Sequence, residues 1–314
     1  MDLGKNNFGY CCLCLSLEHE GVTTNRGMVK RTFLKRGLPY VSELVLKNTE
    51  DLVRIIEWNA SQNITMYRMS SDIFPWCSEY EFSDLPYISQ IKGNLKKAGG
   101  LAISSGMRLS FHPSPYCVIA SMNPDVVIKS IKELRQHGEI MDMMGLPQNH
   151  FYPINIHVNT SKPTKEESAE RFCNAFYSLP DPVKKRLVIE NDDKKSLFTP
   201  NELYELLYLK IGIPITFDFL HYKCNPDPSI PEVDALKKCL STWPDGIRPL
   251  THYSDSKKLY EDSAANDLSH SDWIYNQVET YDLEFSIELE VKMKDLALLK
   301  YFLDFSGDIN NEKL

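Results

Sequence analysis

The sequence contains no apolar run that approaches the length needed to cross a bilayer, which is about 20 residues. Its N-terminus also lacks a basic segment followed by an apolar stretch and a small-residue cleavage site. These two absences predict an intracellular protein, cytoplasmic or nuclear, that is neither secreted nor bound to a membrane.

Nucleotide-binding motifs are missing as well. No GxGxxG follows the first strand-like segment, and no P-loop pattern occurs anywhere in the chain, which argues against dinucleotide-binding folds and P-loop NTPases. The eight cysteines form no pair of CxxC motifs, so we expect mostly buried, reduced thiols. The net charge of −8 shows no excess of basic residues, although a metal cluster would supply local positive charge that a residue count misses.

What the chain does contain is a repeating alternation of strand and helix signals over most of its 314 residues. Strands are expected at 8–15, 65–70, 107–112, 152–159, 186–191, 214–221, 247–253 and 283–291. Helices are expected at 42–61, 87–105, 123–145, 164–178, 199–210 and 231–241. Eight strands alternating with helices predict a single (β/α)8 TIM barrel over residues 1–306, followed by a C-terminal tail at 307–314.

Ionisable side chains fall at the ends of successive predicted strands. The residues are His112, His157, Glu190, Asp218, His221, His252 and Glu290. The C-terminal ends of barrel strands meet at one rim, where barrel enzymes place their active sites. Any one of these residues alone is more often structural than functional.

Together, four imidazoles and three carboxylates would repel or desolvate one another unless cations lay among them. Mixed His and carboxylate sets suit zinc or manganese, and seven ligands exceed the needs of one ion. The pattern therefore predicts a cluster of two or three divalent ions, which is suited to phosphodiester hydrolysis.

Several strings in the chain resemble the UV damage endonuclease family. They are Arg-Leu-Ser-Phe-His-Pro (108–113), Leu-Val-Ile-Glu-Asn-Asp (187–192), Asp-Phe-Leu-His (218–221), Thr-His-Tyr-Ser (251–254) and Glu-Val-Lys-Met-Lys (290–294). The resemblance runs in order from Gly9 to Lys294. It implies a TIM barrel that nicks damaged double-stranded DNA just 5′ of UV photoproducts and other lesions, using a cluster of divalent ions, Mn²⁺ first and Zn²⁺ or Mg²⁺ next.

The resemblance also implies roles for single residues. It adds His270, in a polar loop after the seventh strand, to the seven metal ligands named above. Among these ligands we assign Glu190, His112 and His252 as catalytic. Tyr10 and Tyr116 match aromatic residues that enter the DNA at the lesion, and a tyrosine beside a metal rim can wedge into a base step or stack on a base. Pro115 and Arg68 complete the expected lesion- and DNA-binding set.

The chain departs from the family pattern at three positions. Pro115 replaces a glutamine that probes the lesion, Cys14 replaces an asparagine, and Leu250 replaces a lysine that lies near the metals. The metal ligands are thus present while the lesion-probing residues are altered. We expect the DNA face to carry the basic residues Arg68, Lys162, Lys194, Lys195, Lys223, Lys257 and Lys258.

Two other functions remain open at this stage. A metal-dependent sugar isomerase or epimerase could use the same barrel, and a DNA-lesion binder could have lost catalysis through the altered residues. We expect a monomer with no obligate protein partner.

Overall fold

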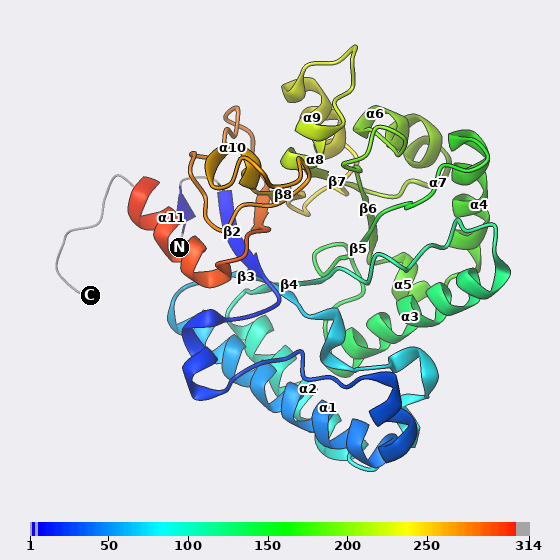
Figure 1. Cartoon of the computed structure of the whole chain (residues 1–314), viewed down its shortest axis with the longest axis vertical. Coiled ribbons are helices and arrows are strands. Elements are labelled where there is room, and N and C mark those ends of the chain that lie inside the picture. Colours follow the sequence, from blue (N-terminus) through cyan, green and yellow to red (C-terminus); the bar gives the residue numbers. More distant parts are fainter. Residues whose placement is uncertain (1, 4–5, 306–314) are drawn as a thin grey trace.

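The computed structural model of the chain describes residues 2–3 and 6–305, so the tail predicted at 307–314 lies outside the described residues. Eight parallel strands, β2 to β9, form a closed barrel because β9 pairs with β2. A ninth strand, β1, pairs antiparallel with β2. The strands are β1 (Asp2–Leu3), β2 (Asn6–Cys11), β3 (Met66–Met69), β4 (Arg108–Phe111), β5 (Ile154–Ile156), β6 (Leu187–Glu190), β7 (Ile215–Asp218), β8 (Leu250–Tyr253) and β9 (Ser286–Leu289). The prediction of a single TIM barrel is confirmed (Figure 1).

Helices surround the barrel and follow most of its strands (Figure 1). They are α1 (Lys30–Ser61), α2 (Ile88–Ser104), α3 (Pro124–Met143), α4 (Lys165–Ser178), α5 (Asp181–Lys184), α6 (Pro200–Leu203), α7 (Leu209–Ile211), α8 (Phe219–Cys224), α9 (Glu232–Leu240), α10 (Lys257–Tyr260) and α11 (Lys294–Phe305). Each of the six predicted helices is present. No helix was predicted after the last strand, where α11 lies. Several predicted strands are too long; the sixth, for example, was predicted to reach His221, but β7 ends at Asp218 and His221 lies in α8.

Local sequence signals explain where several helices begin. The side chain of Asn123 accepts a hydrogen bond from the backbone N–H of Asp125 at the start of α3. Thr199 and Glu202 form a reciprocal capping box at the start of α6. Helix α1 is kinked at Gly37, whose φ of 61° and ψ of −162° are non-helical and suit a residue without a Cβ. The predicted helix at 42–61 is therefore the second part of a longer element.

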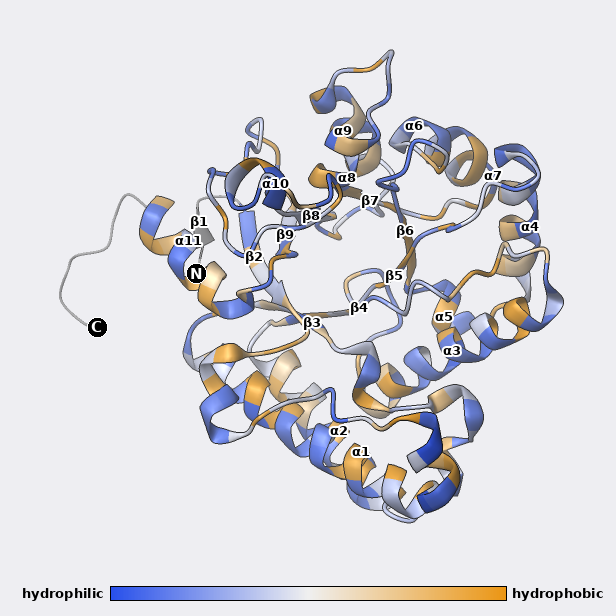
Figure 2. Cartoon of the chain, viewed as in Figure 1, coloured by the Kyte–Doolittle hydropathy of each residue, from blue (hydrophilic) through white to orange (hydrophobic). Residues whose placement is uncertain are grey.

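Strand alternation divides the side chains of the barrel into two sets. One set faces the helices: Phe8 of β2 packs its ring 5.0 Å from that of Tyr301 in α11. The other set faces the barrel axis and includes Met66, Val188 and Leu250, which form a buried apolar cluster with Trp243 from the segment between α9 and β8. Figure 2 shows that the surrounding helices carry both apolar and polar residues, as expected for helices with one face on a core.

The described helices include none that is long and apolar enough to span a membrane. The barrel instead presents a polar rim at the C-terminal ends of its strands. That rim holds the candidate site.

Candidate metal centre

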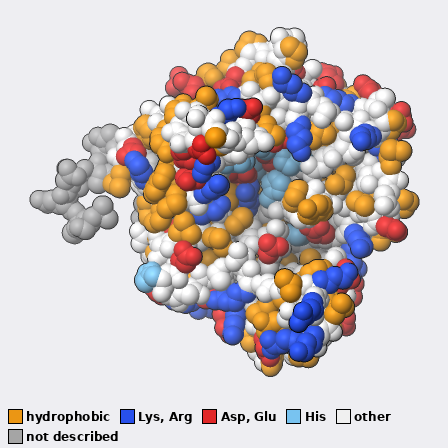
Figure 3. All heavy atoms as spheres, in the orientation of Figure 1, with side chains coloured by type: hydrophobic (Ala, Val, Ile, Leu, Met, Phe, Trp, Pro, Cys, Tyr) orange, Lys and Arg blue, Asp and Glu red, His pale blue; other side chains and the backbone are white. Residues whose placement is uncertain are grey.

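Parallel strand pairing brings the predicted ligands to one rim. Asp218 at the end of β7 lies opposite His252 of β8, which lies opposite Glu288 of β9. His112 follows β4 and His157 follows β5. We call the eight predicted ligands the rim cluster: His112, His157, Glu190, Asp218, His221, His252, His270 and Glu290. Figure 3 shows histidine side chains gathered in the hollow at the middle of this face.

Glu190 is the centre of the rim cluster. Its carboxylate is 1% exposed, and its Oε2 atom lies 3.3 Å from His112 Nε2 and 3.0 Å from His252 Nδ1. Its Oε1 atom lies 3.2 Å from His221 Nδ1, and His157 Nε2 is 3.7 Å from Oε2. One buried carboxylate thus contacts four imidazoles from four different segments.

Two sets of donor atoms within the cluster are compact enough to hold an ion. One set is His112, His157 and Glu190. The other is Glu190, Asp218, His252 and Glu290, and within it His252 Nδ1 lies 3.0 Å from Glu290 Oε1. Glu190 belongs to both sets, so its carboxylate would help to hold an ion in either one.

His221 and His270 lie at one side of these two sets. The backbone N–H of His221 donates to Asp218 Oδ1 at 2.7 Å. The ring centroids of His221 and His270 lie 6.0 Å apart. His270 comes from the loop after β8, where an isolated bridge pairs it with Ser256. Its Nδ1 lies 2.7 Å from Ser254 Oγ. The structure therefore brings the loop histidine to the rim.

The charges at the rim are strongly coupled. Burial raises the pKa of the Glu190 carboxyl, but the neighbouring His252 and His157 outweigh it and hold that pKa well below its usual range. Burial lowers the pKa of the His252 imidazole, but Glu190 and Glu290 raise it by more than burial lowers it, so the net shift is upward. The two opposite shifts have one cause, the attraction between the buried imidazoles and the carboxylates.

Several buried atoms at the rim also lack a hydrogen-bond partner among the described residues. They are His157 Nδ1, Asp218 Oδ2 and both ring nitrogens of His252. The nitrogens lie at ion-pair distances from neighbouring carboxylates but are not aligned for hydrogen bonds. Unpaired buried nitrogen and carboxylate atoms are costly without a cation, and their chemistry fits zinc or manganese. The residues at the rim therefore fit divalent metal ions.

Arg68 does not lie where the sequence analysis expected it. It was assigned to the DNA-binding face, but it is only 9% exposed inside the barrel. Its Nη1 contacts Oε1 of Glu290 and lies 3.7 Å from Oε2 of Glu288. Its charge is therefore already paired with two carboxylates at the end of β9, although Arg68 also lines a pocket at the rim with His270. The DNA contact assigned to Arg68 stays a prediction.

Tyr10 also departs from its expected role. It is fully buried on the helix-facing side of β2, where its hydroxyl donates to Asn59 Oδ1 of α1 at 2.8 Å. Its ring packs 5.1 Å from that of Tyr67. This placement contradicts the expectation that Tyr10 enters DNA, because the side chain of Tyr10 is packed between the barrel and α1.

Tyr116 has the opposite environment. It is 84% exposed in the loop after β4, next to the exposed Pro115 and four residues after the predicted ligand His112. Of the other two family departures, Cys14 is buried with its Sγ 3.7 Å from Asp295 Oδ2, and Leu250 belongs to the apolar cluster below the rim. Neither departure exposes a side chain at the rim.

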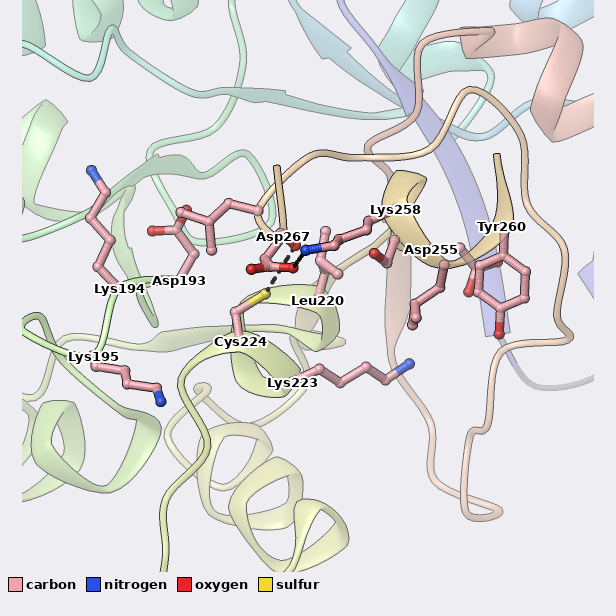
Figure 4. A pocket seen from close by; sticks show the side chains of 13 residues that line it. Asp193, Lys194, Lys195, Leu220, Lys223, Cys224, Asp255, Lys258, Tyr260 and Asp267 are labelled. Atoms are coloured by element: carbon pink, nitrogen blue, oxygen red, sulfur yellow. Dashed lines mark hydrogen bonds and ion pairs between the residues drawn. The ribbon is translucent and has the colours of Figure 1, made fainter. Parts of the chain in front are cut away.

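A pocket of about 650 Å³ lies between the loop after β6, α8 and α10 (Figure 4). One of its lining residues, Leu220, precedes His221 of the rim cluster in α8. Its lining includes Lys194, Lys195, Lys223 and Lys258. Lys258 is paired with Asp267 at 2.6 Å, whereas the other three lysines have no carboxylate partner among the described residues. Outside the pocket, Lys257 is paired with Asp272 at 2.8 Å. The predicted basic face is therefore narrower than expected and centres on Lys194, Lys195 and Lys223.

Sequence reasoning missed two carboxylates beside the rim cluster. Asp192 Oδ1 lies 3.3 Å from His157 Nδ1, and Glu288 Oε2 lies 3.2 Å from His252 Nε2. Each stands two residues along the chain from a predicted ligand, Glu190 or Glu290. The two-residue period of extended chain was a usable signal, because it places such neighbours on the same side.

Comparisons with known proteins identify the family. The profile of the family described as UV-endonuclease UvdE matches residues 6–312. The UV DNA damage endonuclease of Clostridium perfringens is 32% identical over 93% of this chain and 69% of its own length. The crystal structure of SacUVDE superposes with a TM-score of 0.82 at 30% identity, covering 96% of this chain and 98% of that one.

A more distant likeness shows the fold alone. The 3-keto-D-glucoside 4-epimerase YcjR of E. coli superposes with a TM-score of 0.57 at 8% identity, covering 96% of this chain and 98% of that one. The full-length family match and the much closer structural agreement with SacUVDE decide the assignment. This chain belongs to the UV-endonuclease UvdE family.

Proposed function

We propose that the protein hydrolyses the phosphodiester bond 5′ to UV photoproducts or other lesions in double-stranded DNA, with two or three divalent ions, Mn²⁺ foremost, held by the rim cluster. The observation that carries the proposal is the convergence of four imidazoles on the buried carboxylate of Glu190. Membership of a UV-endonuclease family supports the choice of DNA as substrate.

The residues have distinct tasks in this account. His112, His157 and Glu190 would hold one ion, and Glu190, Asp218, His252 and Glu290 another, with His221 and His270 completing the cluster. When bound, such ions lower the pKa of water and stabilise the leaving oxygen of a phosphodiester. Glu190 keeps the two sets together because its two oxygens face different imidazoles. Glu190, His112 and His252 are the residues on which hydrolysis depends most directly.

The pocket lysines fit the DNA backbone. Lys194 and Lys195 follow the end of β6 and Lys223 lies in α8, so all three stand beside the rim on segments that would face a bound duplex (Figure 4). Lysines that neutralise phosphates position a protein on DNA without reading its sequence. The pocket lining also includes Asp193, Asp255 and Asp267, so the lysines give the pocket only a small excess of positive charge.

Recognition of the lesion falls to the loop after β4. Tyr116 is exposed close to His112, so its ring is free to stack on a base displaced from the duplex. Pro115 has no side-chain hydrogen-bonding group, so lesion reading at this loop rests on shape and stacking. We propose that the protein favours lesions that already weaken base stacking.

A nicking assay on duplexes with defined lesions tests the proposal. We expect a single nick 5′ to the lesion with Mn²⁺, and none after EDTA treatment until Mn²⁺ is restored. Nicking that continues unchanged in EDTA would refute the metal-dependent mechanism. The sugar isomerase alternative has only a shared fold in its support, and a lesion binder without catalysis would show binding but no nick at any Mn²⁺ concentration.

A further inference from the structure

A second carboxylate from β9, Glu288, lies one layer below the rim cluster. It is fully buried and faces the barrel axis, as Glu290 does, because the two residues lie two positions apart on extended chain. The layer below includes the apolar Met66, Val188 and Leu250 and the buried Arg108. Burial lowers the pKa of the Arg108 guanidinium, and the charge of Glu288 acts to raise it. A buried carboxylate is costly unless it is paired and hydrogen-bonded.

Three polar side chains contact Glu288. The hydroxyl of Ser110 donates to its Oε1, and Arg68 Nη1 lies 3.7 Å from its Oε2. His252 Nε2 lies 3.2 Å from the same Oε2, although the two atoms are not aligned for a hydrogen bond. Among the described residues, His252 is the one member of the rim cluster that lies at ion-pair distance from Glu288.

The two nitrogens of His252 face different partners. Nδ1 faces Glu190 and Glu290, which belong to its own set of donors, and Nε2 faces Glu288. A histidine binds a metal through one nitrogen only if its proton sits on the other, and an acceptor at that other nitrogen fixes the tautomer and the ring orientation. His112 finds such an acceptor in a backbone oxygen, with its Nδ1 3.0 Å from the carbonyl of Pro113. His252 has a carboxylate in that place.

We propose that Glu288 is a positioning residue of the metal centre. It accepts a hydrogen bond from the Nε2–H group of His252, which leaves Nδ1 free to bind the ion that Glu190, Asp218 and Glu290 would also hold. Arg68 lies between Glu288 and Glu290 and offsets the charge of both. This inference rests on the proposed metal centre and adds to it a residue that contacts neither ion nor DNA.

Metal affinity tests the role without relying on activity. The full chain is stripped of metal and titrated with Mn²⁺, followed by calorimetry and by the electron paramagnetic resonance of bound Mn²⁺. Glu288→Met removes the acceptor while keeping side-chain length, and we expect Mn²⁺ to bind about 10–100-fold more weakly. Glu288→Gln retains an oxygen acceptor but loses the charge, so we expect a smaller loss of about fivefold.

Asp295→Asn is the matched control. Asp295 is another fully buried carboxylate, but it accepts from the backbone N–H groups of Leu15 and Ser16 outside the barrel. We expect this variant to bind Mn²⁺ as the unaltered protein does. Wild-type affinity in Glu288→Met, or equal weakening in Asp295→Asn, would overturn the inference.

The outcomes also separate this inference from the proposed function. If the unaltered protein binds no Mn²⁺, the metal centre itself fails and the role of Glu288 fails with it. If the unaltered protein binds Mn²⁺ and Glu288→Gln binds it equally well, only the role of Glu288 is refuted. The Gln variant alone decides the matter if Glu288→Met does not fold.

Discussion

Nδ1 of His252 lies 3.0 Å from Oε2 of Glu190, although the two residues stand on strands β8 and β6, which are separated by β7. Both side chains point to the inside of the barrel, where the curvature of the sheet lets them meet above β7. The contact joins the two donor sets of the rim cluster through one carboxylate.

Tyr116 provides a test of lesion recognition. We expect Tyr116→Ala to fold normally, because the side chain is 84% exposed, and to nick damaged DNA about tenfold more slowly. The reason is that the variant can no longer stack on a base, an interaction worth about 1–3 kcal/mol per base. Nicking rates on a defined lesion measure the effect.

Tyr177→Ala is the control for this prediction. Tyr177 is 64% exposed near the C-terminal end of α4, away from the loop after β4. It should leave the rate unchanged. Equal rates for Tyr116→Ala and the unaltered protein would remove Tyr116 from the account.

The pocket lysines provide a test of DNA binding. Neutralising Lys194, Lys195 and Lys223 to glutamine should weaken binding to all duplexes alike. It should also reduce the slope of log affinity against log salt concentration by up to about 2.7, which is roughly 0.9 for each phosphate that the variant no longer neutralises. Fluorescence anisotropy across a salt series measures this slope.

A triple variant on the outer helices serves as the control for charge alone. Lys47, Lys92 and Lys96 are exposed on α1 and α2, and their replacement by glutamine changes the net charge equally. Their slope should match that of the unaltered protein. A similar fall in both triple variants would mean that the pocket makes no specific phosphate contact.

Metal-free stability should fall as pH rises. Burial lowers the pKa of His221 and His252, but Asp218, Glu190 and Glu290 outweigh it, so both imidazoles have a pKa above the ordinary value. A histidine whose pKa is higher in the folded protein than in the unfolded chain stabilises the fold. This contribution is complete at a pH below the unfolded-state pKa of about 6.5, and it is lost as the pH rises through the folded-state pKa.

Melting temperatures in EDTA and in Mn²⁺ measure this dependence. In EDTA we expect a decline from about pH 6.5 upward, whereas Mn²⁺ should stabilise the protein more as the pH rises, because metal ligands must be deprotonated. Parallel curves in the two conditions would contradict the assignment of these histidines as ligands.

The sequence predicted the barrel and the rim for the same physical reason. Strand periodicity is a local signal, and parallel strands must end at one face, so residues such as His112, Glu190 and His252 could be placed together without a structure. Hydrogen-bond partners of single side chains are not local. Arg68 looked like a surface cation because its partners, Glu288 and Glu290, lie at the far end of the chain.

Tyr10 illustrates the other kind of failure. A resemblance carries over a residue type at a position, but it does not say which side of the strand the side chain faces. In this chain Tyr10 faces α1, where Asn59 accepts its hydroxyl proton. His221 shows a milder case, because the strand signal continued past Asp218 into what is the short helix α8.

The central claim is that hydrolysis depends on metal ions held around Glu190. The most direct measurement is nicking of UV-irradiated duplex by Glu190→Gln in Mn²⁺, beside the unaltered protein and Asp295→Asn. Because Glu190 belongs to both donor sets, its replacement should slow nicking by more than about 100-fold, which exceeds the cost of losing a residue that only orients a ligand. The circular dichroism spectrum should stay that of a folded barrel. Nicking by folded Glu190→Gln at the rate of the unaltered protein would contradict the account.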